Sequence, residues 1–89
     1  MRTTLTAAAA EGARAAAVRG HGIDDGRARI RTMLDGSVAS GAVTSVDVRD
    51  ARRGGLAVTV VELRATLPLL GMLGPQSLVV HGTAVREGP

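Results

Sequence analysis

The stretch that decides the fold runs from Val43 to Thr66 and reads VTSVDVRDARRGGLAVTVVELRAT. Two runs rich in β-branched residues flank the pair Gly54-Gly55, and apolar side chains alternate with polar ones along the first run. A period of two is typical of a strand with one buried face. Adjacent glycines between two such runs indicate a tight turn, because glycine adopts positive φ without strain. The stretch therefore predicts a β-hairpin with strands over 43–50 and 56–66.

The second strand of this hairpin admits two arrangements of its side chains. In the first, Leu56, Val58 and Val60 face the covered side, and the same register continues through Glu62 and Arg64 beyond the covered region. In the second, which we favour, a β-bulge near residues 60–61 switches the faces and turns the following apolar residues inward. Those inward residues are Val61, Leu63 and Ala65.

A third strand is predicted over 77–87, on the C-terminal side of the hairpin. One face of that strand carries apolar or small residues, namely Leu78, Val80, Gly82 and Ala84. A period of two again places these residues on one side of the sheet. The strand follows the hairpin after only a short connection, so we expect it to extend the same sheet in the antiparallel sense.

Two helices are predicted before the hairpin. Residues 3–19 are rich in alanine, the best helix former, and Gly20 is expected to end this helix in the left-handed conformation. A stripe of mostly small residues recurs at helical spacing: Leu5, Ala9, Gly12/Ala13 and Ala16. Such a stripe permits close approach to a sheet or to another helix. A second helix is expected over 24–36, with Asp24 or Asp25 as its N-cap.

The predicted order is ααβββ, which defines an α+β fold with two helices on one face of a three-stranded antiparallel sheet. A chain of 89 residues is one small domain, because chains divide into several cores only at much greater length. We therefore predict a single domain over 1–89, with the sheet over 43–87.

Composition excludes several classes of site. The sequence contains no Phe, Trp, Tyr or Cys, so it has no aromatic platform for stacking bases or sugars and no thiol nucleophile. Its two imidazoles, His21 and His81, lack the spacing of a metal site, and its serines lack the context of a catalytic nucleophile. We expect no catalytic, cofactor-binding or metal-binding residues, no cofactor and no enzymatic activity.

The connection over 67–76 is unusually apolar. Its large apolar residues are Leu67, Leu69, Leu70, Met72 and Leu73. Two interpretations stay open: the segment folds back over the edge of the core, or it presents a docking surface to another subunit or to a lipid surface. On the second interpretation, the candidate partner-binding residues are Leu69, Leu70, Met72 and Leu73.

Four segments, in this order along the chain, resemble the TadE-like proteins of tight-adherence (Flp-type) pilus assembly. They read AAAEGARAAAVRG at 8–20, GGLAVTV at 54–60, LPLL at 67–70 and LVVHGTAVRE at 78–87. The resemblance implies a non-enzymatic minor pilin or pseudopilin with a pilin-like α+β head. Its partners would be other pilus subunits and the assembly machinery, with no nucleic acid and no small-molecule substrate.

The same resemblance implies an N-terminal membrane helix that a prepilin peptidase processes. Residues 3–19 would then be the outer part of that helix, and the head would lie at the cell surface, anchored to the cytoplasmic membrane. The family's processing and anchor residues match no position of this sequence. We expect about 20 apolar residues to be encoded directly upstream, the length that a bilayer core requires.

The alternative function is a small basic intracellular module that binds nucleic acid. The chain has a net charge of +3, and all 11 of its cationic side chains are arginines. The candidate phosphate-binding residues are Arg27, Arg31, Arg52 and Arg53. The absence of aromatic side chains counts against this interpretation, because single-stranded nucleic acids are usually bound by stacking as well as by charge.

Overall fold

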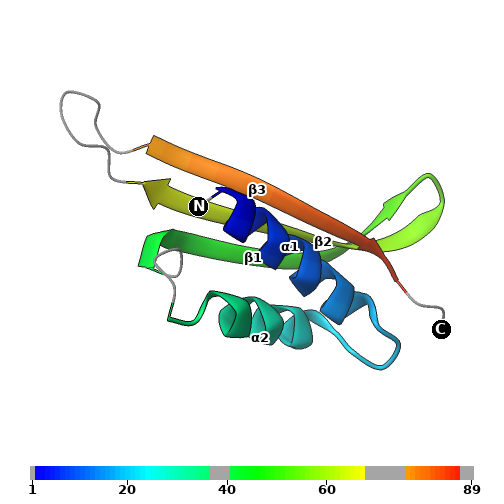
Figure 1. Ribbon diagram of the computed structural model, residues 1–89. Coiled ribbons are helices and arrows are strands. Elements are labelled where there is room, and N and C mark those ends of the chain that lie inside the picture. The colour runs from blue at the N-terminus through cyan, green and yellow to red at the C-terminus, as the bar shows by residue number, and fades with distance from the viewer. Residues whose placement is uncertain (1, 37–40, 68–75, 87–89) are drawn as a thin grey trace.

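The computed structural model describes residues 2–36, 41–67 and 76–86. Its elements are α1 (Arg2–Ala17), α2 (Ile23–Leu34), β1 (Val43–Arg53), β2 (Leu56–Leu67) and β3 (Gln76–Val85). Two helices pack on a three-stranded antiparallel sheet (Figure 1), so the predicted α+β fold and its ααβββ order are confirmed. The strand boundaries differ from the predicted ones by no more than three residues.

The sheet has the order β1-β2-β3, and both neighbouring pairs are antiparallel. β2 is therefore the central strand, while β1 and β3 are the edges. Gly54 and Gly55 connect β1 to β2 with φ of 57° and 83°. Positive φ at both central residues is the signature of a two-residue type I′ turn, so the glycine pair forms the hairpin as predicted.

The bulge predicted near residues 60–61 is wrong. The pairing of β1 with β2 is unbroken from Ser45 to Arg53, and the register shift found in the described residues lies between Val43 and Ser45. Plain alternation therefore holds along this part of β2. Glu62 needs no bulge to reach solvent, because it continues the register of residues that face away from the helices.

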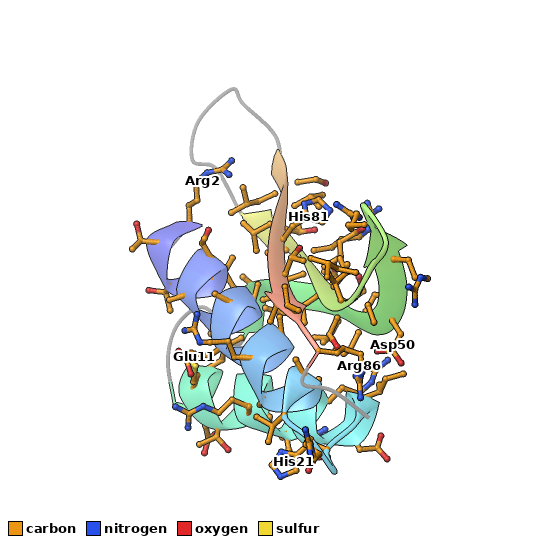
Figure 2. All side chains as sticks on the ribbon, turned by 90° about the vertical axis from the view of Figure 1, so that its right-hand side faces the viewer. Arg2, Glu11, His21, Asp50, His81 and Arg86 are labelled. Carbon is orange, nitrogen blue, oxygen red and sulfur yellow. The ribbon has the colours of Figure 1, made fainter. Side chains whose placement is uncertain are left out.

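β2 consequently carries apolar side chains on both of its faces. Val61, Leu63 and Ala65 belong to the core under the helices, as predicted. Val58 and Val60 point to the opposite face, yet they are only 4% and 1% exposed. The β1–β2 hairpin reaches past the end of β3 and curves, with side chains gathered inside the curve (Figures 1 and 2). The hairpin end of the sheet thus buries part of its outer face without the helices.

α1 packs through a face of small side chains. Its buried residues are those of the predicted stripe (Leu5, Ala9, Gly12, Ala13 and Ala16) together with Ala8 and Ala17. A Cβ added at Gly12 would lie 2.5 Å from Cγ1 of Ile30 in α2, and one at Gly26 would lie 2.9 Å from the carbonyl oxygen of Gly12. The two helices therefore cross at a separation that leaves no room for a larger residue at either glycine.

The sheet meets α1 at a third glycine, Gly82 in β3. A Cβ added there would overlap the carbonyl group of Ala9 and lie 2.6 Å from the backbone nitrogen of Ala10. These are backbone atoms, which cannot rotate away as the end of a flexible side chain can. Gly82 therefore sets the distance between the helical layer and the sheet.

The helix ends differ in part from the prediction. α1 ends at Ala17, two residues early, and Gly20 follows with a φ of 85° as expected. The N-cap of α2 is Gly22 rather than Asp24 or Asp25. The backbone nitrogen of Gly22 donates to Oδ2 of Asp25 at 2.7 Å, and that of Asp25 donates to the Gly22 carbonyl at 3.1 Å. Asp25 thus stabilises the helix start from inside the first turn.

We predict that Gly82→Ala destabilises the protein by about 1–3 kcal/mol, the usual cost of overpacking a core. Alanine is otherwise favoured over glycine within a strand by roughly 0.5–1 kcal/mol, so the sign of the change reports the contact with α1. Gly41→Ala is the matched control, because Gly41 has open space around its Cβ position and no positive φ. Urea unfolding should show stability that is unchanged or slightly raised in the control. Equal stability of the two variants would contradict the tight packing of α1 on β3.

Candidate functional site

The predicted partner-binding residues, Leu69, Leu70, Met72 and Leu73, lie outside the described residues. The segment that carries them starts after Leu67 at the end of β2 and finishes before Gln76 at the start of β3, and the backbones of these two residues are paired. The segment therefore begins and ends at one end of the sheet. The β1–β2 turn lies at the opposite end of the sheet.

α1 runs parallel to β3, in the same chain direction. Near the C-terminus of α1, Nη1 of Arg86 donates to the Ala16 carbonyl at 3.2 Å, and near its middle the Ala9 backbone meets Gly82. Seven residues of helix rise about 10 Å and four residues of strand about 13 Å, so helix and strand run nearly side by side. The N-terminus of α1 therefore points toward the end of the sheet where β2 ends and β3 begins (Figure 1).

The four arginines of the nucleic-acid interpretation do not form one patch. Arg27 and Arg31 lie on α2, and Nη1 of Arg27 donates to the Val46 carbonyl at 2.9 Å. Arg52 and Arg53 lie at the hairpin end of β1, six and seven residues beyond Val46. At about 3.3 Å per residue, that distance along the strand is about 20 Å. The structure therefore separates the two pairs.

A groove of about 320 Å³ lies between α2 and β1. Apolar side chains and three charged ones line it: Arg27, Ile30, Arg31, Leu34, Asp35, Val43 and Val46. The hydrogen bond from Arg27 to Val46 joins α2 to this edge of the sheet. It also occupies a carbonyl on an edge strand, where another strand could otherwise pair.

Arg86, directly after β3, links four segments at the hairpin end of the domain (Figure 2). Its Nη1 lies 2.9 Å from Oδ1 of Asp50 and 3.0 Å from Oγ1 of Thr59. Nη1 also donates to the Ala16 carbonyl at 3.2 Å, and Nη2 donates to the His21 carbonyl at 3.4 Å. One guanidinium group therefore connects β1, β2, the C-terminus of α1 and the connection between the helices.

Burial makes this cluster stronger than an ordinary surface ion pair. The Arg86 side chain is 26% exposed, and Thr59 is fully buried. The Thr59 hydroxyl also donates to Oδ1 of Asp50 at 3.3 Å, so it both donates and accepts. Sequence patterns assigned no role to Arg86, because its side-chain partners and the Ala16 carbonyl lie 27, 36 and 70 residues away. One local feature could have drawn attention to it: position 86 continues the alternation of the helix-facing residues Leu78, Val80, Gly82 and Ala84.

The two histidines lie on different parts of the surface (Figure 2). Nδ1 of His21 is 3.1 Å from the Ala15 carbonyl, whereas Nε2 of His81 is 3.4 Å from Oε2 of Glu62 on the outer face of the sheet. Across residues 2–36, 41–67 and 76–86, no three His, Cys, Asp or Glu side chains come together in a group that could hold a metal ion.

Comparison of the chain with protein-family models, with curated proteins and with solved structures finds no match. Within the part of the chain that the structure describes, no helix has both the length and the apolar character needed to cross a bilayer.

We predict that Arg86→Met lowers the free energy of unfolding by about 1–2 kcal/mol. Hydrogen bonds to charged groups contribute roughly 1.5–3 kcal/mol, and the half-exposed Asp50 carboxylate reduces that figure through screening by solvent. Arg53→Met is the matched control, since the Arg53 side chain is exposed and forms no hydrogen bond or ion pair with the described residues. The control should unfold within about 0.5 kcal/mol of the parent. Thermal unfolding measures the stability of both variants. Equal losses of unfolding free energy in the two would show that the hydrogen bonds of Arg86 add no stability beyond that of an exposed arginine.

Proposed function

We propose that this chain is the head of a TadE-like minor pilin or pseudopilin, a non-enzymatic subunit that acts through protein–protein contacts in a tight-adherence pilus. The direction of α1 is the observation that supports this proposal most strongly. The N-terminus of α1 points to the end of the sheet at which the segment over 68–75 begins and ends. A helix that extends α1 toward the N-terminus would leave the head at that same end.

The proposal gives the apolar connection a physical role. A membrane helix needs about 20 apolar residues, and such a helix continuing into α1 would bring the β2–β3 end of the head close to the bilayer or to neighbouring subunits. Large apolar side chains are favoured there, because contact removes their surface from water. The proposed contact residues are Leu69, Leu70, Met72 and Leu73.

The double variant Leu70→Ser/Met72→Ser tests this role. We expect the isolated head to stay folded, at a cost below the roughly 2–5 kcal/mol of truncating one buried Leu or Met. In cells that make the pilus, the same change in the native protein should reduce its co-purification with other pilus subunits. Thermal unfolding and affinity co-purification measure the two effects separately.

Leu56→Ser is the matched control, because Leu56 is 56% exposed at the opposite end of the sheet. It should leave both the stability and the co-purification unchanged. If the double variant unfolds, the connection is part of the core and is not a docking surface. If the double variant is folded and co-purifies as the parent does, the proposed contact with pilus subunits is wrong.

A further inference from the structure

The free edge of β3 can be identified from one hydrogen bond. The backbone nitrogen of Arg86 donates to the Ala57 carbonyl at 2.9 Å, so the pair Arg86–Ala57 is bonded across β2 and β3. In an antiparallel pair, residues alternate between those bonded to the neighbouring strand and those bonded on the other side. The outward backbone groups on β3 are therefore those of Ser77, Val79, His81, Thr83 and Val85.

The other edge of the sheet checks this assignment. The same alternation can be followed across the sheet. On β2 the residues not bonded to β3 are bonded to β1, and the register of β1 with β2 then leaves the Val46 carbonyl pointing away from β2. That carbonyl accepts the hydrogen bond from Arg27, which an inward carbonyl could not do while also bonding to β2. The alternation is therefore consistent across the whole sheet.

The two edges differ in how well they are protected. The β1 edge carries the Arg27 bond, a register shift near its start, and charged residues along its length, all of which discourage pairing with another strand. On β3, residues 77–85 include no Asp, Glu, Lys or Arg. Among the described residues, no hydrogen bond is found to the outward backbone groups of β3.

α1 leaves this edge open. A groove of about 480 Å³ lies between the C-terminal half of α1 and the end of β3. It is lined by Arg14, Ala17, Val18, Thr83, Ala84 and Val85. Figure 1 shows β3 along one border of the sheet, with α1 on the side toward β2 and β1. An added strand could therefore lie beside β3 without displacing the helix.

We propose that β3 pairs antiparallel with β3 of a second copy of this chain, around a twofold axis at His81. The two sheets then form one continuous sheet of six strands. This proposal does not rest on the proposed pilus function. It concerns a different surface, because the edge of β3 runs along the sheet and the segment over 68–75 lies at one end of it.

Self-complementarity favours a second copy over an unrelated strand. When the register centres on His81, every outward residue meets another outward residue: 77 meets 85, 79 meets 83, and 81 meets itself. A shift of two residues in either direction would place Val85 or Ser77 opposite a residue outside β3. One register therefore uses the whole edge, and each such pair exchanges two backbone hydrogen bonds.

The side chains on the helix-facing side of the sheet fit this register. On the helix-facing side, Val80 would lie opposite the partner's Gly82, and Leu78 opposite the partner's Ala84, so that large residues meet small ones. Residues 77–85 include no Asp, Glu, Lys or Arg to oppose the contact, and the two His81 imidazoles would meet at the axis. Each imidazole lies beside Glu62 of its own chain at 3.4 Å.

The first experiment compares oligomeric states by sedimentation equilibrium over a wide range of concentration. We expect the parent chain to form dimers and Thr83→Pro to weaken the dimer by at least tenfold, because proline removes an outward N–H. The sheet of each chain should survive, since Gly82 and Ala84 make the bonds to β2. Arg52→Pro removes an outward N–H from the β1 edge and should leave the dimer unchanged.

The second experiment tests the register through single cysteine substitutions in a chain that otherwise has no cysteine. Opposed residues of a bonded pair have Cα atoms about 5.5 Å apart, within the range of a disulfide, so His81→Cys should form a covalent dimer under mild oxidation. Thr83→Cys is the control, because position 83 of one chain would lie four residues along the strands from position 83 of the other, about 13 Å. It should form no disulfide.

Each alternative result overturns the proposal. A parent chain that stays monomeric at every concentration excludes a dimer through β3. A folded Thr83→Pro variant that still dimerises as the parent does would place the contact on another surface. If Thr83→Pro fails to fold, the cysteine variants decide: equal cross-linking of both, or of neither, contradicts a twofold axis at His81.

Discussion

The structure depends on how closely the backbone of α1 approaches the segments packed against it. Gly12 and Gly26 let α1 cross α2, and Gly82 lets β3 contact the Ala9 backbone. The chain has no aromatic side chain, and a buried methyl group contributes only about 0.8 kcal/mol, against roughly 1.5–3 for a whole Leu or Val side chain. A core lined by so many alanines therefore gains its stability from close contact over many atoms rather than from a few large residues. That is why glycines lie at the crossings.

The hydrogen bonds of the domain restrain different parts of it in different ways. At the hairpin end, the Arg86 guanidinium joins the connection between the helices to β1 and β2. Along the β1 edge, Arg27 holds α2 against the sheet. Both arginines bind backbone carbonyls, so they restrain the position of main-chain segments as well as of side chains. Hydrogen bonds thereby restrain the domain at the hairpin end and along β1, whereas the β3 edge receives no comparable contact from the described residues.

This asymmetry is what makes the proposed contacts physically distinct. Contact through the β3 edge would use backbone groups, whose spacing any strand of matching register can meet. Contact through the segment over 68–75 would use large apolar side chains, whose gain grows with the area removed from water. The proposed pilus subunit would need more than one contact surface, and a rigid domain keeps such surfaces at fixed positions relative to each other.

Local patterns in the sequence were enough to predict the elements and much of the packing. The period of two in Val46 and Val48, the pair Gly54-Gly55 and the small-residue stripe of α1 are local signals, and each depends only on nearby backbone geometry. The tertiary structure decided the rest. Both faces of β2 are apolar, so periodicity could not tell a bulge from a sheet that curls over Val58 and Val60. The separation of the arginine pairs, the partners of Arg86 and the unequal edges all join residues distant in sequence. No local pattern records such distances, because they arise only when the strands pair and the helices cover one face.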